Sequence, residues 1–84
     1  SLNSPKFNKL LSVVDSLNVA ITDDESLGEG FCIGHSYFCQ LTEVTDAILA
    51  NIVTYELIPL IKEYWFDVPQ KVKEWSDNLW RAIS

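Results

Sequence analysis

The chain has 84 residues, enough for one compact domain and too few for two with separate cores. Hydrophobic residues make up 48% of it and charged residues 21%, a balance typical of a folded domain rather than of a disordered segment. The net charge of −6 and the scattered lysines and arginines argue against direct binding to nucleic acid. No apolar run approaches the roughly 20 residues that cross a bilayer, so the sequence predicts no membrane span.

The two cysteines, Cys32 and Cys39, are fewer than a small secreted scaffold would carry, and we expect reduced thiols in a cytoplasmic protein. Together with His35 they offer three zinc ligands. A fourth ligand is missing, so we predict no metal site, and the zinc alternative would require metal in the purified protein. Because methionine is absent from the sequence, we expect the chain to be a piece of a longer protein.

The first predicted helix covers residues 5–21. Ser4 can cap free backbone amides, and Pro5 at the first helical position loses no intrahelical hydrogen bond. Apolar residues then recur at steps of three and four, which indicates one buried face: Phe7, Leu10, Leu11, Val14, Leu17 and Ile21. An irregular segment is expected over residues 22–41, because an acidic stretch and glycines end the periodicity.

The second predicted helix covers residues 43–66, with Thr42 or Thr45 as its cap. Pro59 removes a backbone donor and crowds the preceding turn, so it predicts a kink there rather than an end. Two apolar rows indicate burial on a wide face: Val44, Ile48, Ile52 and Tyr55 in one, and Leu49, Val53, Leu57, Leu60 and Tyr64 in the other.

The third predicted helix covers residues 68–83 and opens at Pro69. Its apolar residues Val72, Trp75, Leu79 and Ile83 fall at steps of three and four, with Trp80 beside them. The predicted fold is therefore all-α, a small bundle of three main helices forming a single domain over residues 1–84. We interpret the apolar stripes as core packing rather than as ligand sites.

Two motifs carry a resemblance to a known family. Residues 33–38 read Ile-Gly-His-Ser-Tyr-Phe, and residues 58–65 read Ile-Pro-Leu-Ile-Lys-Glu-Tyr-Trp. Their order and spacing resemble the carboxyl-terminal region of McrB-like AAA+ proteins of methylcytosine-dependent restriction systems. The stretch from Leu17 to Ile21 also resembles that family's L-N-x-R-I pattern, although Ala20 stands where arginine is expected. The loop over residues 23–30 is longer than usual, and the final helix has no recognised counterpart.

The resemblance implies a carboxyl-terminal helical lid that follows an αβα NTPase domain in the same polypeptide. In such proteins the lid closes over GTP or ATP, bound with Mg by the other domain, and supports a homo-oligomeric ring that works with an McrC-like nuclease subunit. The phosphate-binding pattern G-x-x-x-x-G-K-[ST] does not occur in this sequence. We therefore expect no catalytic residue and no bound cofactor in this chain, whereas its parent would be a GTPase or ATPase subunit of a DNA restriction endonuclease.

By their place in the motif, Gly34, His35 and Ser36 are the nucleotide-facing candidates. His35 can donate a hydrogen bond to a phosphate, Gly34 permits close backbone approach, and Ser36 can donate its hydroxyl. A structural alternative stays open, in which His35 bonds a backbone carbonyl between the first two helices. The structural anchors predicted for the motifs are Tyr37, Phe38 and Pro59.

Two further hypotheses concern the chain's acidic character. The acidic side chains of the loop, Asp23, Asp24, Glu25 and Glu29, lack the spacing of a calcium loop and predict a solvated surface. The alternative function is an acidic helical protein-protein interaction module that plays no part in nucleotide binding. A lid predicts an apolar face left exposed on the isolated domain, whereas an adaptor predicts a patch unrelated to the segment around His35.

Overall fold

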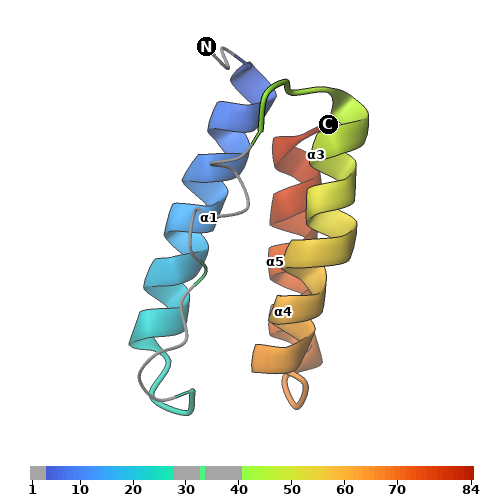
Figure 1. Cartoon of the computed structure of the whole chain (residues 1–84). Helices are drawn as coiled ribbons and strands as arrows, with labels where there is room; N and C mark the ends of the chain where they lie inside the picture. The colour runs from blue at the N-terminus through green and yellow to red at the C-terminus, as the bar shows by residue number, and fades with distance from the viewer. Residues whose placement is uncertain (1–3, 28–32, 34–40) are drawn as a thin grey trace.

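The computed structural model describes residues 4–27, 33 and 41–84, and that part of the chain is all-helical, as predicted. α1 (Pro5–Asp23) stands beside a second rod built from α3 (Asp46–Ile52), η1 (Val53–Leu57) and α4 (Ile58–Tyr64). α5 (Pro69–Ala82) returns antiparallel to both (Figure 1). The start of α1 and the end of α5 therefore lie at the same end of the bundle.

α1 begins as the sequence predicts. The Ser4 hydroxyl accepts a hydrogen bond from the Phe7 amide at 3.2 Å, and Pro5 occupies the first turn. The helix ends at Asp23, two residues beyond the predicted end at Ile21. Asn18 and the β-branched residues lower the intrinsic helix propensity here, but the burial of Ile21 outweighs that preference.

The long rod begins at Asp46 rather than at residue 43, because Thr45 is the residue that caps it. Its hydroxyl accepts from the Ile48 amide at 3.1 Å. The Asp46 carboxylate lies in the first turn, where negative charge is favourable, and it pairs with Lys6 at 3.2 Å. The rod ends at Tyr64 instead of residue 66.

The helix continues past Pro59, as predicted, and the distortion takes the form of a π-helical turn, η1, immediately before it. In η1 the Ile58 amide donates to the Val53 carbonyl, five residues back. Pro59 has no amide to donate, and in a regular α-helix its ring would press against the carbonyl of Tyr55. The wider turn relieves that conflict without ending the helix.

The π turn also sets which residues of the rod face the core. Buried positions follow steps of four through the rod: Leu49, Val53, Leu57, Ile61 and Trp65. In a regular α-helix each such step would drift around the axis by roughly 40°, and a turn that holds more residues reduces the drift. In the second predicted row Leu60 and Tyr64 are only half-buried, and in the first predicted row Tyr55 was wrong, because it is 70% exposed.

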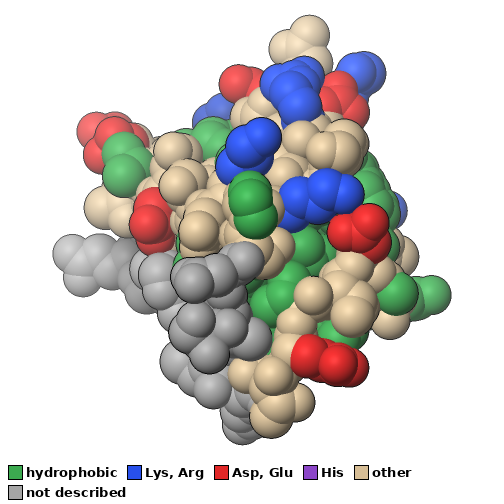
Figure 2. All heavy atoms as spheres, turned by 90° about the horizontal axis from the view of Figure 1, so that it is seen from above, with side chains coloured by type: hydrophobic (Ala, Val, Ile, Leu, Met, Phe, Trp, Pro, Cys, Tyr) green, Lys and Arg blue, Asp and Glu red, His purple; other side chains and the backbone are tan. Residues whose placement is uncertain are grey.

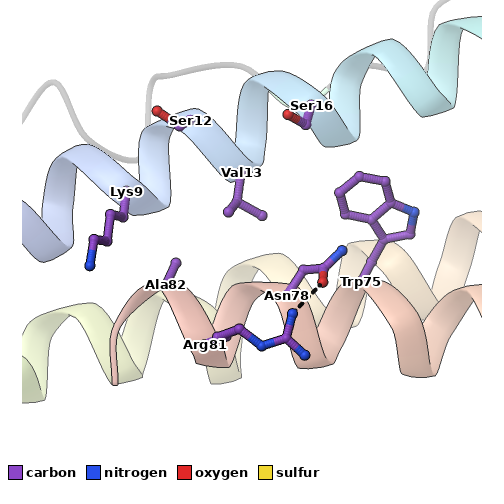
Figure 3. A pocket seen from close by; sticks show the side chains of 8 residues that line it. All are labelled: Lys9, Ser12, Val13, Ser16, Trp75, Asn78, Arg81 and Ala82. Atoms are coloured by element: carbon purple, nitrogen blue, oxygen red, sulfur yellow. Dashed lines mark hydrogen bonds between the residues drawn. The ribbon is translucent and has the colours of Figure 1, made fainter.

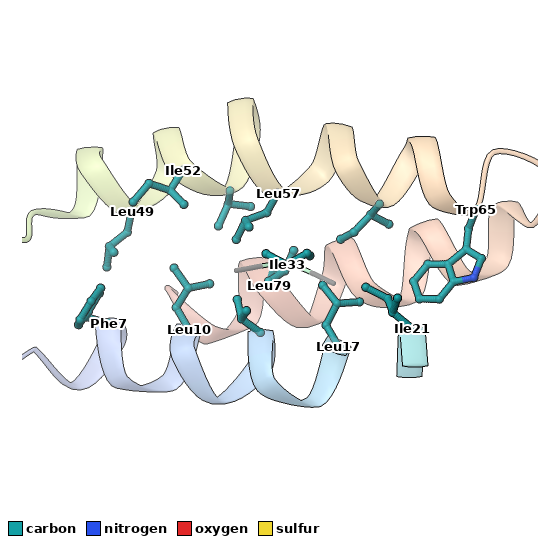
Figure 4. Packing of buried hydrophobic residues seen from close by; sticks show 13 residues of the cluster. Phe7, Leu10, Leu17, Ile21, Ile33, Leu49, Ile52, Leu57, Trp65 and Leu79 are labelled. Atoms are coloured by element: carbon teal, nitrogen blue, oxygen red, sulfur yellow. The ribbon is translucent and has the colours of Figure 1, made fainter. Parts of the chain in front are cut away.

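α5 covers Pro69–Ala82, within one residue of the prediction at each end. It contacts both α1 and α4, and it buries Leu79 fully. Figure 4 shows the side chains of all three rods meeting around Leu79 and Ile33. Among the described residues, no helix combines the length and the apolar character that crossing a membrane requires.

Candidate functional site

The predicted nucleotide-facing residues and two of the predicted anchors lie outside the described residues: Gly34, His35, Ser36, Tyr37 and Phe38. The zinc alternative lies outside them as well, because it needs Cys32, His35 and Cys39. The third anchor, Pro59, is described. It is exposed in the first turn of α4, where it acts on the backbone rather than in the core.

Ile33 is the described residue next to the predicted site, and Asn18 holds its backbone from both sides. The Asn18 Nδ2 donates to the Ile33 carbonyl at 2.8 Å, and the Ile33 amide donates to the Asn18 Oδ1 at 2.7 Å. Both distances are short for N–H···O bonds. One side chain thus fixes the orientation of one residue of a segment that is 15 positions away.

The carboxamide of Asn18 suits this pair of bonds, because it donates one and accepts the other. Asparagine carries a donor and an acceptor in one plane, whereas aspartate would place a negative oxygen against the Ile33 carbonyl. α1 positions the amide, because Leu17 and Ile21 point into the core and leave Asn18 half-buried on the flank. A polar side chain therefore pairs with the backbone at the edge of the core.

The side chain of Ile33 adds a second fixation. It is 2% exposed and packs within the core cluster, which contributes about 2 kcal/mol relative to an exposed position. Backbone pairing to Asn18 and side-chain burial together fix where the polypeptide enters Gly34. The residue before the candidate segment is therefore held by rigid elements, which is a requirement for precise placement of a functional group.

A second polar anchor lies at the carboxyl end of α1. The Asp24 Oδ2 accepts from Trp65 Nε1 at 2.7 Å and from Lys71 Nζ at 2.8 Å, while its Oδ1 accepts from Ser26. The Lys71 ammonium also lies 5.2 Å from the centre of the Trp65 ring, within cation-π range. One carboxylate thus connects the end of α1 to the end of α4 and the start of α5.

The prediction that this acidic stretch is simply solvated was wrong for Asp24, whose side chain is only 11% exposed. The Lys71 ammonium lowers its pKa far below the ordinary 3.8, and the hydrogen bonds from Ser26 and Trp65 lower it further. A negative charge at the carboxyl end of a helix is otherwise unfavourable. The three donors outweigh that effect and stabilise the ionised form of Asp24. Asp23 and Glu25 are exposed, as expected.

The described residues contain no group of three histidine, cysteine, aspartate or glutamate side chains that could hold a metal ion. The described polar side chains instead hold other parts of the chain in place: Asn18 binds the backbone of Ile33, and Asp24 binds Trp65 and Lys71. Sequence reasoning missed both roles, because the partners are far away along the chain. For Asn18 the available signal was its place inside the family-like stretch from Leu17 to Ile21, next to a stripe that is otherwise apolar.

Comparison with known proteins gives a consistent result. The family model described as "McrB, alpha-helical lid domain" matches residues 9–73. The "Type IV methyl-directed restriction enzyme EcoKMcrB subunit" of Escherichia coli (strain K12) is 38% identical over 81 residues. That match covers 89% of this chain and 18% of the relative, so the chain spans less than a fifth of that protein's length. No solved structure matches.

Proposed function

Because the chain belongs to the family of McrB α-helical lid domains, we propose that it closes over a nucleotide bound by an αβα NTPase domain of the same polypeptide. In this proposal the nucleotide is GTP or ATP with Mg, held by that other domain. The lid presents Gly34, His35 and Ser36 to the phosphates, where His35 donates a hydrogen bond to the charge that develops during transfer.

The observation that carries the proposal is the grip of Asn18 on Ile33. A side chain can stabilise a developing charge only when its position is fixed in advance. Ile33, directly before Gly34, is fixed by burial and by two hydrogen bonds between its backbone and the Asn18 side chain, which supports a positioning role for α1. Asn18 is then a positioning residue, acting on His35 through the backbone.

The wider context follows from the relative's name as a restriction enzyme subunit. We propose that the parent polypeptide is the nucleotide-hydrolysing subunit of a cytoplasmic DNA restriction system. It assembles as a homo-oligomeric ring and works with an McrC-like nuclease subunit. The lid itself makes no direct contact with DNA in this scheme, in keeping with its net charge of −6.

The test uses the complete polypeptide that carries this domain. His35→Ala is expected to lower kcat for nucleotide hydrolysis by roughly 100- to 1,000-fold with the fold intact, the range seen when a single charge-stabilising donor is removed. Asn18→Ala is expected to lower kcat by a smaller factor, because it loosens the position of His35 without removing it. Unchanged turnover in a folded His35→Ala protein would remove this residue as a phosphate contact.

The alternative, an acidic interaction module, is favoured by the exposure of Phe66 and Tyr55, at 80% and 70%. Phe66 lies in the turn between α4 and α5. Nucleotide turnover that is unaffected by both His35→Ala and Asn18→Ala, together with loss of a protein partner in Phe66→Ser, would favour this alternative.

A further inference from the structure

A groove of about 470 Å³ runs between α1 and α5. Val13 and Ala82 form its apolar floor, and Trp75 stands at one end with its ring toward α1 (Figure 3). Lys9 lies at the other end, and Arg81 reaches along the α5 side. The groove therefore joins an aromatic and aliphatic surface to two cations.

The two cations of the groove have no acidic partner within the part of the chain that the structure describes. Among the described residues, Lys6, Lys71 and Lys73 each pair with an aspartate, whereas neither Lys9 nor Arg81 has a carboxylate within ion-pair distance. Arg81 donates only to the Asn78 side chain, at 3.3 Å. Seen from the end where α1 begins and α5 ends, most basic side chains lie on one half of the surface, with acidic side chains among them (Figure 2). Although the net charge of the chain is −6, two positive groups beside an apolar groove are thus unpaired among residues 4–27, 33 and 41–84.

The exposure and the charge of the groove indicate which kind of ligand fits it. Lys9 and Arg81 are exposed, so a small molecule would be covered on one side only, whereas small-molecule sites bury most of the ligand. The whole chain carries a net charge of −6, which opposes contact with an extended anionic surface. Two cations are too few to hold nucleic acid or an anionic membrane firmly against that net charge.

We propose that the groove between α1 and α5 docks an acidic, amphipathic polypeptide segment of another protein. An apolar side chain of the segment packs on Val13 and Trp75, and a carboxylate one helical turn away pairs with Lys9 and Arg81. Aromatic and arginine side chains are the residue types that dominate such contacts, and Trp75 and Arg81 supply both. This docking does not depend on the proposed nucleotide role of the lid.

The experiment titrates the ¹⁵N-labelled 84-residue chain with a helical peptide that carries leucine and glutamate side chains on one face. The largest changes in chemical shift are expected at the Val13 and Asn78 amides and at the Trp75 indole N–H. Arg81→Glu and Lys9→Glu are each expected to weaken binding by about ten-fold, because each replaces an attraction by a repulsion. A peptide with lysine in place of glutamate should bind the Arg81→Glu chain better than it binds the unaltered one.

The matched control is Lys62→Glu, which makes the same charge change at an exposed lysine of α4 outside the groove. It is expected to leave the peptide affinity unchanged within about two-fold, apart from long-range charge effects that salt removes. The proposal is overturned if the glutamate peptide does not bind, if a glutamine peptide binds as well, or if the shifts lie elsewhere. Binding to phosphatidylserine vesicles but not to the peptide would also overturn it.

Discussion

The two polar anchors of α1 lie six residues apart and do different work. Asn18 is neutral and holds the backbone of one residue, Ile33, on both sides. Asp24 is charged and accepts hydrogen bonds from Trp65, at the end of α4, and from Lys71, at the start of α5. The first anchor orients Ile33, and the second joins the ends of three helices. Both anchors therefore contribute to stability, but only the first acts on the residue that precedes the candidate segment.

The largest loss of stability is expected at the Asp24 anchor, where the indole of Trp65 both fills the core and donates to Asp24. Trp65→Ala should lower the free energy of unfolding by about 3–5 kcal/mol, the range for removing a buried aromatic ring. Trp65→Phe keeps most of the ring but loses the donor, and should cost about 1 kcal/mol beyond the lost ring volume. Urea denaturation followed by circular dichroism measures both. Equal losses in the two variants would show that the bond to Asp24 dominates.

The positioning anchor is expected to give the next largest loss. Asn18→Ala leaves the amide and carbonyl of Ile33 without these partners, which should lower the free energy of unfolding by about 2–3 kcal/mol. The matched control is Asn8→Ala, since Asn8 is an exposed asparagine of the same helix, and a loss under about 0.5 kcal/mol is expected there. If the two variants unfold at the same urea concentration, the Asn18 bonds contribute nothing to stability.

Low pH should separate the two anchors, because of Asn18 and Asp24 only Asp24 carries a charge that a proton can remove. Its pKa is lowered in the folded chain, so the unfolded chain takes up the proton at the higher pH. The contribution of Asp24 is therefore complete above about pH 5 and is lost as the pH falls through 3.8 toward its lowered pKa. Asp24→Asn should flatten the fall of unfolding free energy below pH 5, while Asn18→Ala should leave its slope unchanged.

The control for the acid experiment is Asp23→Asn, which removes the same charge from the exposed neighbouring residue. In that variant the free energy of unfolding should fall with decreasing pH as steeply as it does in the unaltered chain. A slope in Asp24→Asn that equals the slope of the unaltered chain would contradict the role assigned to the carboxylate.

The smallest effect is expected at an ion pair that lacks the surroundings of Asp24. Lys73 pairs with Asp77 at 2.7 Å, but their side chains are 79% and 50% exposed. Lys73→Ala should change the free energy of unfolding by less than about 0.5 kcal/mol, because solvent screens such pairs. Thermal unfolding at low and high salt checks this. A loss comparable to that of Asn18→Ala would mean that short distance alone, without burial, determines what a polar contact contributes here.

Local sequence signals predicted the helices well. Ser4, Pro5 and Thr45 act within a single turn, so their caps could be read from neighbouring residues, and the apolar stripe of α1 fixed its buried face. The continuation of the helix through Pro59 was also predictable, because apolar residues follow it at helical spacing.

What the sequence did not reveal depends on contacts between distant residues. Asp24 meets Trp65 and Lys71 across 41 and 47 positions, and no local pattern distinguishes it from the solvated Asp23. The π turn shifts the buried row from Leu60 to Ile61, because steps of four replace the α-helical pattern. The roles of Gly34, His35 and Ser36 remain predictions from the family resemblance.

The most direct test of the positioning role is hydrogen exchange at the Ile33 amide, which donates to Asn18. In the unaltered chain this amide should be protected, and in Asn18→Ala it should exchange about ten-fold faster or more, beyond any change at the core amides of Val53 and Leu57. An Ile33 amide that exchanges equally fast in both chains, or that accelerates only as much as those core amides, would contradict the claim that Asn18 holds the entry to the candidate segment.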